Sequence, residues 1–170
     1  MTICVYNHGV IYADRAGLGR SSVPRLVEMK KLFVSPCKYF AIAVSGKIVD
    51  TQADDYRKVV SQLKSQLKIA DATNVGFKLT KEQITYFGTR AVLIMTSRNI
   101  YYLAEEDKDP MFVILDKTLP AFIGSGSTMA SVAMVAGKEP IDAIRIASMC
   151  DLASYETEID RVTMAELKPY

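Results

Sequence analysis

Two short β-rich runs flank a polar turn within the first fourteen residues. The runs cover residues 2–6 and 9–14, and the turn is Asn7-His8-Gly9, in which Asn and Gly tolerate positive φ. This arrangement predicts a β-hairpin at the start of the chain. Residues 17–24, which contain several Gly and Ser residues, predict a loop after the hairpin.

Further β-rich runs along the chain predict additional strands. They are Met29–Val34, Tyr39–Ser45, Ala91–Thr96, Ile100–Leu103, Met111–Leu115, Ala121–Ile123 and Glu158–Met164. The last run alternates between apolar and polar residues and predicts an edge strand. Between the strands, Ser35-Pro36 predicts a turn, and the mostly acidic residues 105–109 predict a solvated turn.

From Asp50 the apolar positions change to the helical period. They fall on one face, with Lys, Arg, Gln and Ser on the other, and this amphipathic pattern ends near Ala70. A second, shorter helix is expected to begin at Thr80, because Thr80 and Gln83 have the spacing of a capping box.

Two more helices are expected toward the end of the chain. Ser125 to Ala136 is rich in small and flexible apolar residues and stops at Gly137, a suitable C-cap. Glu139-Pro140 opens the next helix, with Pro in its first turn. Antiparallel strand pairs with helices inserted in pairs predict two stacked sheets whose outer faces are covered by helices. We therefore expect an α+β fold, a four-layer αββα sandwich.

Composition narrows the class of protein. The 170 residues are 49% hydrophobic and 24% charged, which favours a single domain over residues 1–170 with one substantial core. Lys and Arg total 21 against 19 for Asp and Glu, so bulk charge favours neither a nucleic-acid nor a membrane partner. Neither a signal peptide nor an apolar run long enough to span a bilayer is visible, and we expect a cytoplasmic protein.

Three cysteines, Cys4, Cys37 and Cys150, lie in largely apolar stretches and form no CxxC pair. Together with a single histidine, His8, they do not have the spacing of a zinc site. We expect them to be reduced, buried and structural, and we expect no metal and no cofactor. A lone histidine in a turn also gives poor support to a Ser-His-Asp or Cys-His mechanism.

Thr2 directly follows the initiator Met1. Methionine aminopeptidase accepts a small second residue, so removal of Met1 gives Thr2 a free α-amine beside its hydroxyl. An N-terminal amine has an ordinary pKa of about 7.7–8.0, and a Thr paired with it is a known activated nucleophile. Many proteins nevertheless begin with Met-Thr without any such role.

Asp14 closes the second predicted strand, and Lys30-Lys31 lie in a strand-like run where alternation turns one lysine inward. A buried lysine needs a carboxylate partner, which Asp14 is able to supply. A protonated lysine beside Thr2 favours an alkoxide-like nucleophile. The alternative is that both lysines are solvated and Asp14 only ends a strand.

Two polar turns at helix ends are further candidates. Gly124-Ser125-Gly126 lies between a strand and a helix, where backbone N–H groups and the Ser hydroxyl bind an anion or order a polar network. Asp151 and Ser154 are spaced by three at the end of the last helix. Simple helix capping is the alternative for both.

Six short motifs follow one another in the order seen in a known family: TIC at 2–4, YAD at 12–14, KKLF at 30–33, SGKIVDTQ at 45–52, GSGS at 124–127 and DLAS at 151–154. On these motifs the chain resembles, over nearly its whole length, the proteasome β-subunit family of N-terminal nucleophile hydrolases, which includes HslV. The resemblance implies a threonine-type endopeptidase that acts on polypeptides through an acyl-enzyme. It also implies self-assembly into homo-oligomeric rings and a possible unfoldase ATPase partner.

Roles for individual residues are likewise implied by the resemblance. Thr2 is the nucleophile with its own amine as base, Asp14 and Lys31 form the ion pair that tunes it, and the Gly46 N–H donates to the oxyanion. The resemblance also implies a polar network around the amine, made by Ser125, Asp151 and Ser154. It implies a hydrophobic specificity pocket, lined by Val44 and Ile48. Two other functions stay open: a catalytically silent protein of this fold used for assembly or binding, and an amidohydrolase of a small amide.

Overall fold

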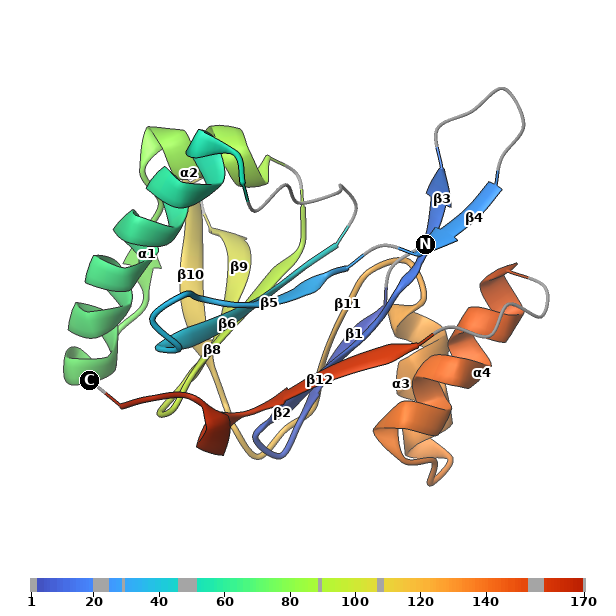
Figure 1. Cartoon of the computed structure of the whole chain (residues 1–170). Coiled ribbons are helices and arrows are strands. Elements are labelled where there is room, and N and C mark those ends of the chain that lie inside the picture. Colours follow the sequence, from blue (N-terminus) through green and yellow to red (C-terminus); the bar gives the residue numbers. More distant parts are fainter. Residues whose placement is uncertain are drawn as a thin grey trace.

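Two β-sheets lie face to face, and a pair of helices covers the outer face of each (Figure 1). The computed structural model describes residues 3–19, 25–28, 30–45, 52–88, 90–106, 109–152 and 158–169. This architecture confirms the expected α+β class and the four-layer αββα sandwich.

Antiparallel pairing joins the described strands of both sheets. The first sheet has the order β11-β1-β2-β12, with the strands Cys4–Asn7 (β1), Val10–Asp14 (β2), Ala121–Ile123 (β11) and Ile159–Thr163 (β12). The second has the order β5-β6-β8-β9-β10-β7, with the strands Leu32–Val34 (β5), Phe40–Val44 (β6), Phe77–Lys78 (β7), Val92–Thr96 (β8), Ile100–Glu106 (β9) and Asp109–Leu115 (β10). β12 is an edge strand, as its alternating sequence predicted.

The helices cover the sheets in pairs, α1 and α2 on the larger sheet and α3 and α4 on the smaller (Figure 1). They are Asp54–Thr73 (α1), Lys81–Phe87 (α2), Ser127–Val135 (α3) and Pro140–Leu152 (α4), and a 3₁₀ turn, Met164–Glu166 (η1), follows β12. The predicted capping box of α2 is confirmed: Gln83 N–H donates to Thr80 Oγ1, and Thr80 N–H donates to Gln83 Oε1. α1 ends at Thr73 rather than Ala70, because Asn74 stops it in the left-handed conformation. Asp50, its predicted start, lies outside the described residues.

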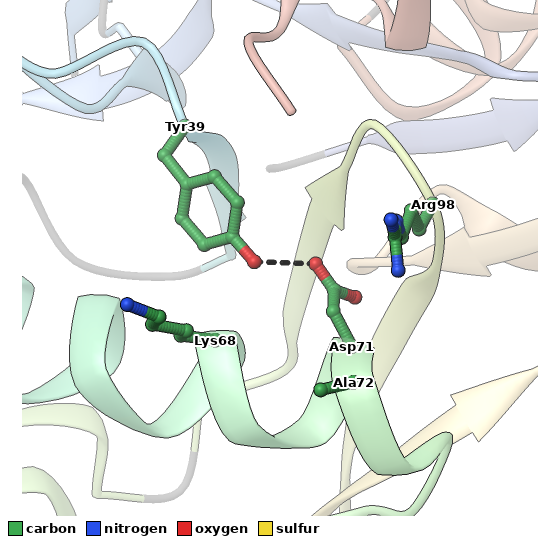
Figure 2. A pocket seen from close by; sticks show the side chains of 5 residues that line it. All are labelled: Tyr39, Lys68, Asp71, Ala72 and Arg98. Atoms are coloured by element: carbon green, nitrogen blue, oxygen red, sulfur yellow. Dashed lines mark hydrogen bonds between the residues drawn. The ribbon is translucent and has the colours of Figure 1, made fainter. Parts of the chain in front are cut away.

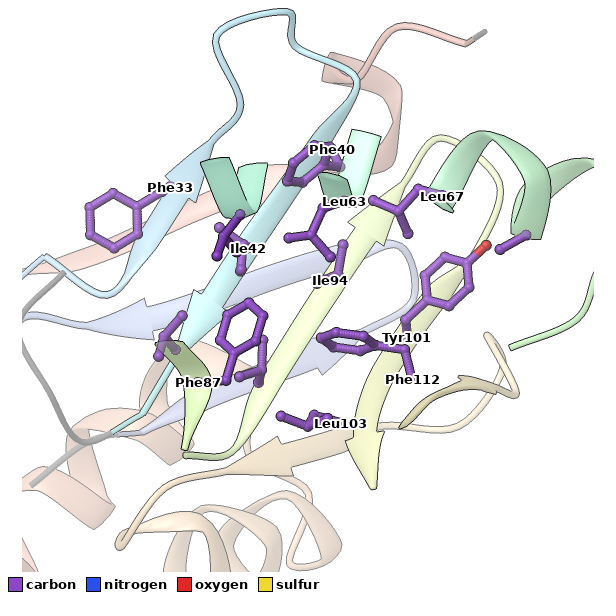
Figure 3. Packing of buried hydrophobic residues seen from close by; sticks show 14 of the residues in the cluster. Phe33, Phe40, Ile42, Leu63, Leu67, Phe87, Ile94, Tyr101, Leu103 and Phe112 are labelled. Carbon is purple, nitrogen blue, oxygen red and sulfur yellow. The ribbon is translucent and has the colours of Figure 1, made fainter. Parts of the chain in front are cut away.

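Three apolar clusters fill the three spaces between the four layers. The cluster between the larger sheet and α1 and α2 is rich in aromatic residues, including Phe40, Phe87, Tyr101 and Phe112 (Figure 3). Smaller side chains such as Ala41 and Ala43 face the other sheet. Under α3 and α4 the core is built around Ile3 and Val5, with alanines on the helices. Both faces of each sheet are therefore buried, which explains why β6 is apolar at every position.

The predicted β1–β2 hairpin is confirmed, with Asn7 paired to Val10. Its two central residues, His8 and Gly9, have φ of +44° and +81°. A two-residue hairpin turn of type I′ needs positive φ at both central positions, so His8 takes the conformation that the sequence had assigned to Asn7.

Two predicted loops are partly strands. Within residues 17–24, Gly17 and Gly19 belong to a hairpin of Ala16–Gly19 (β3) and Arg25–Glu28 (β4), which projects from the sandwich (Figure 1). Backbone pairing there overrides the low strand propensity of glycine. Within residues 105–109, the β9–β10 ladder continues to its end pair, Glu106 and Asp109.

The expectation that all three cysteines are buried was wrong. Cys4 is buried on β1, Cys37 is half-buried in the β5–β6 turn, and Cys150 is exposed on α4; all three are free thiols. None of the described helices is both long and apolar enough to pass through a membrane. Within the same residues, no cluster of three or more His, Cys, Asp or Glu side chains is arranged to hold a metal ion.

Candidate active site

A buried ion pair joins the last residue of β2, Asp14, to Lys31, the residue before β5. Lys31 Nζ lies 2.8 Å from Asp14 Oδ1, and the side chains are 4% and 0% exposed. The same carboxylate oxygen accepts the Ile3 N–H at 2.7 Å, and Asp14 N–H donates to the Ile3 carbonyl. Lys31 Nζ also donates to the Ala16 carbonyl. The predicted pair is thus present and is bonded to the backbone of the residue that follows Thr2.

Of the two neighbouring lysines, only Lys31 is buried. Lys31 directly precedes β5, and its carbonyl accepts the Val44 N–H of the adjacent strand at 3.0 Å. Lys30 is exposed, and its ammonium lies 5.8 Å from the centre of the Phe33 ring. The prediction that one of the two lysines turns inward is confirmed.

Burial shifts the pKa values of the acidic groups around the Asp14–Lys31 pair. Desolvation raises the pKa of the Asp14 carboxyl above its ordinary value, while the Lys31 ammonium and the Ile3 N–H act in the opposite direction. Burial likewise raises the pKa of the neighbouring Cys4 thiol, and the Asp14 charge adds to this shift. Cys4 therefore stays a neutral thiol near neutral pH and is a poor candidate nucleophile.

Most of the other predicted site residues belong to parts of the chain that the structure does not describe. Thr2, Gly46, Ile48 and Ser154 lie outside the described residues. Asp151 lies in the last turn of α4, and its side chain is outside the described part.

Ser125 lies in the turn between β11 and α3 and is exposed. β11 pairs with β1 so that Ile123 is opposite Cys4, which brings this turn to the end of β1 where the chain starts. Gly126, the N-cap residue of α3, is so close to β1 that an added Cβ would overlap the Ile3 side chain. A glycine is therefore required at position 126 for packing, independently of any role of Ser125.

Val44, predicted to line a specificity pocket, is only 2% exposed. It belongs to the cluster between the larger sheet and α1 and α2, with Tyr56 and Phe87. Alternation along β6 directs Phe40, Ile42 and Val44 toward these helices. This prediction is corrected: the side chain of Val44 is part of the core.

Two partners of the ion pair were not identified from the sequence. The Ala16 carbonyl and the Ile3 N–H are backbone groups, so their residue types give no sign that they bind a lysine or a carboxylate. Only the turn of the chain after β2 brings Ala16 back over Lys31.

A second polar cluster, around Asp71, lies near the C-terminal end of α1 (Figure 2). The buried Asp71 carboxylate accepts four side-chain hydrogen bonds, from Tyr39 Oη at 2.5 Å, Tyr101 Oη at 2.7 Å, Thr96 Oγ1 at 3.0 Å and Asn99 Nδ2 at 3.1 Å. A pocket of about 250 Å³ opens beside it, lined by Tyr39, Lys68, Asp71, Ala72 and Arg98. Burial and the Asp71 carboxylate raise the pKa of Tyr101, so its hydroxyl remains a donor. Because four donors already occupy the carboxylate, we interpret the cluster as structural.

Replacing Asp71 with alanine is expected to lower the free energy of unfolding by about 3 kcal/mol or more, because several buried donors lose their acceptor at once. Asp71→Asn should cost less, since the amide oxygen still accepts hydrogen bonds. Urea unfolding of the three proteins measures both effects. A loss below about 1 kcal/mol for the alanine variant would contradict the structural role of this carboxylate.

Comparison with known proteins finds this fold among solved structures but finds no match by sequence. No protein-family model matches the chain, and no curated protein sequence matches it significantly. Among solved structures, eukaryotic HslV from Trypanosoma brucei superposes with a TM-score of 0.56 at 16% identity, over 95% of this chain and 98% of that one. Thiobacillus denitrificans BPH gives 0.53 at 15% identity, over 96% and 98%. BPH in complex with epoxomicin gives 0.51 at 14% identity, over 99% and 100%. The sandwich that carries the Asp14–Lys31 pair therefore has the proteasome/HslV-like fold.

Proposed function

We propose that the chain is a hydrolase of the N-terminal nucleophile type, a threonine-type endopeptidase in which Thr2 acts after Met1 is removed. The observation that carries this proposal is the Asp14–Lys31 pair. A buried ammonium is held by a carboxylate that also bonds to Ile3, the residue next to Thr2. Such a fixed positive charge favours the ionised form of a nearby hydroxyl.

In the proposed reaction, the hydroxyl of Thr2 is the nucleophile and the α-amine of the same residue is the base. The Thr2 α-amine takes the hydroxyl proton while Oγ1 attacks the carbonyl carbon of a peptide bond. The tetrahedral intermediate collapses, the C–N bond breaks, and the leaving amine takes that proton. Water, deprotonated by the same amine, hydrolyses the ester and restores Thr2. The Lys31 charge stabilises the oxygen nucleophile throughout.

Supporting roles complete the proposed site. The Gly46 N–H donates to the oxyanion, and losing one such donor typically costs about 2.7–4 kcal/mol of transition-state stabilisation. Ser125, Asp151 and Ser154 order the amine, and Ile48 contributes an apolar wall to the pocket for the substrate side chain.

We further propose a cytoplasmic homo-oligomeric ring that takes unfolded polypeptides, served by an unfoldase ATPase. The likeness to HslV supports the ring. Among the described residues, α3 exposes the apolar side chains of Met129, Val132 and Val135, which are 42%, 58% and 88% exposed. An apolar surface of this kind is suited to contact with another copy of the chain.

Intact-mass analysis and peptide hydrolysis test the function together. Protein from the native host is expected to lack Met1 and to cleave fluorogenic peptides, and epoxomicin, found in complex with BPH, is expected to inhibit that cleavage. Quantitative retention of Met1 would refute the peptidase. Loss of Met1 without any hydrolysis would favour a silent binding protein. Hydrolysis of small amides but not of peptides would favour an amidohydrolase.

A further inference from the structure

One residue, Arg15, joins the end of β2 to the start of β3. Its two sequence neighbours both bind the buried ammonium: Lys31 Nζ lies 2.8 Å from Asp14 Oδ1 and donates to the Ala16 carbonyl. Because peptide units are planar, the direction of that carbonyl is set by the backbone dihedrals of Arg15 and Ala16. Contacts that fix the Arg15 backbone therefore also fix an acceptor of Lys31.

Arg15 is bonded to the neighbouring edge strand through both its backbone and its side chain. Its N–H donates to the Glu158 carbonyl at 3.1 Å. The guanidinium donates to Asp160 through two nitrogens, Nε to Oδ2 at 3.0 Å and Nη2 to Oδ1 at 2.7 Å. The third nitrogen, Nη1, donates to Glu158 Oε2 at 2.8 Å. All four bonds connect this one residue to β12 and to the residue that precedes β12.

The register of β2 and β12 places the guanidinium and the Asp160 carboxylate side by side. Ala13 is opposite Asp160 in this ladder, and Arg15, two residues after Ala13, continues on the same face. Arg15 is thus a diagonal neighbour of Asp160, within reach of a long side chain. The two side chains are 32% and 19% exposed, so salt screens this pair less than a fully exposed one. The two bonds from a planar guanidinium also restrict its orientation.

We propose that Arg15 is a positioning residue of the candidate active site. Its pair with Asp160 holds the turn between β2 and β3, and this turn presents the Asp14 carboxylate and the Ala16 carbonyl to Lys31. Arg15 acts through these two acceptors and needs no contact with the substrate. The inference deepens the proposed function and rests on it for the effect on catalysis, while every contact that carries it joins described residues.

Loss of the bonds to β12 should loosen the surroundings of Lys31. The Ala16 carbonyl is then able to turn away, which leaves the buried ammonium with fewer acceptors. In the proposed reaction the same charge stabilises the nucleophile, and this effect depends on a fixed position. A misplacement of about 1 Å is enough to cost on the order of 100-fold in rate. We therefore expect two measurable effects, a more reactive Lys31 amine and a lower kcat.

Amine labelling measures the first effect without any catalysis. Each folded protein is treated with a trace of an acylating reagent, and mass spectrometry compares the label on Lys31 with that on Lys30, its exposed neighbour, in one peptide. The test variants are Arg15→Gln and Asp160→Asn, which break the pair from either strand and keep polar side chains. Arg161→Gln is the matched control, because Arg161 is an exposed arginine of β12 outside the pair.

Two further variants separate positioning from general stability. Asp71→Asn lowers stability at a distant cluster, so it should leave the Lys31-to-Lys30 labelling ratio unchanged. Arg15→Lys keeps the positive charge but loses the planar fork, so it should fold even where Arg15→Gln does not, and it should still raise the ratio. Urea unfolding verifies that each protein is folded under the labelling conditions.

Arg15→Gln and Asp160→Asn are each expected to raise the labelling ratio about tenfold. Each should also reduce kcat on a fluorogenic peptide at least about fivefold with KM unchanged, while Arg161→Gln changes neither quantity. A wild-type ratio in both test variants overturns the positioning role and leaves the peptidase intact. Hydrolysis that survives Thr2→Ala overturns the peptidase, whereas the labelling ratio still decides whether Arg15 positions Lys31.

Discussion

Replacing Thr2 with alanine is expected to reduce peptide hydrolysis by at least about 10⁴-fold, to the background rate. The variant keeps the α-amine, because a small second residue still permits removal of Met1, but it has no oxygen to form the acyl-enzyme. Loss of a nucleophile has effects of this size in hydrolases that act through an acyl-enzyme. Steady-state rates on a fluorogenic peptide measure the change, and intact mass verifies that Met1 is absent.

Thr2→Ser is the matched control, since it keeps both the hydroxyl and the amine. It should retain measurable hydrolysis with the same pH dependence, because the base and the Asp14–Lys31 pair are unchanged. Both variants should unfold at the wild-type temperature. Activity of the alanine variant within tenfold of wild type would show that Thr2 is not the nucleophile.

Local sequence signals predicted most of the fold. The β1–β2 hairpin, the Thr80 capping box and the long amphipathic helix each depend on residues within a few positions of one another. The β3–β4 hairpin was missed because its glycines are typical of loops, whereas its stability depends on pairing between residues 16–19 and 25–28.

The alternation of inward and outward side chains along a strand predicted one part of the candidate site, the buried lysine. It indicated that one of Lys30 and Lys31 is buried, and a buried lysine requires a carboxylate. The role that the resemblance implied for Val44 was wrong: both faces of β6 are covered, and an entirely apolar strand does not tell which side chains face a pocket.

The Asp71 cluster shows what a single sequence does not reveal. Its donors come from the β5–β6 turn, from β8 and from the β8–β9 region, 25 to 32 residues away from Asp71. Taken singly, Asp71 is one more polar residue near the end of an amphipathic helix. Only the packing of α1 against the larger sheet brings these groups together.

Replacing Lys31 with methionine is expected to abolish hydrolysis and to lower the free energy of unfolding by about 3–5 kcal/mol. The substitution keeps the length and apolar stem of the side chain but leaves the Asp14 carboxylate, which is 0% exposed, without its counter-ion. Urea unfolding measures the stability, and peptide hydrolysis measures the activity. Lys30→Met is the control, because Lys30 is exposed and should change neither quantity appreciably.

The same substitution should make stability depend more steeply on pH, because the Lys31 ammonium no longer opposes the rise in the Asp14 pKa. Without the ammonium, burial holds the pKa of native Asp14 above that of the unfolded chain, so the native state binds more protons between the two values. Stability then falls as pH rises through that window, and the cost of Lys31→Met should shrink as pH is lowered from about 7 toward about 4. The double variant Asp14→Asn/Lys31→Met removes both charges while keeping an acceptor for the Ile3 N–H, so it should recover most of the stability at neutral pH but none of the activity. An equally unstable double variant would show that Lys31 stabilises the fold through its bond to the Ala16 carbonyl rather than through Asp14.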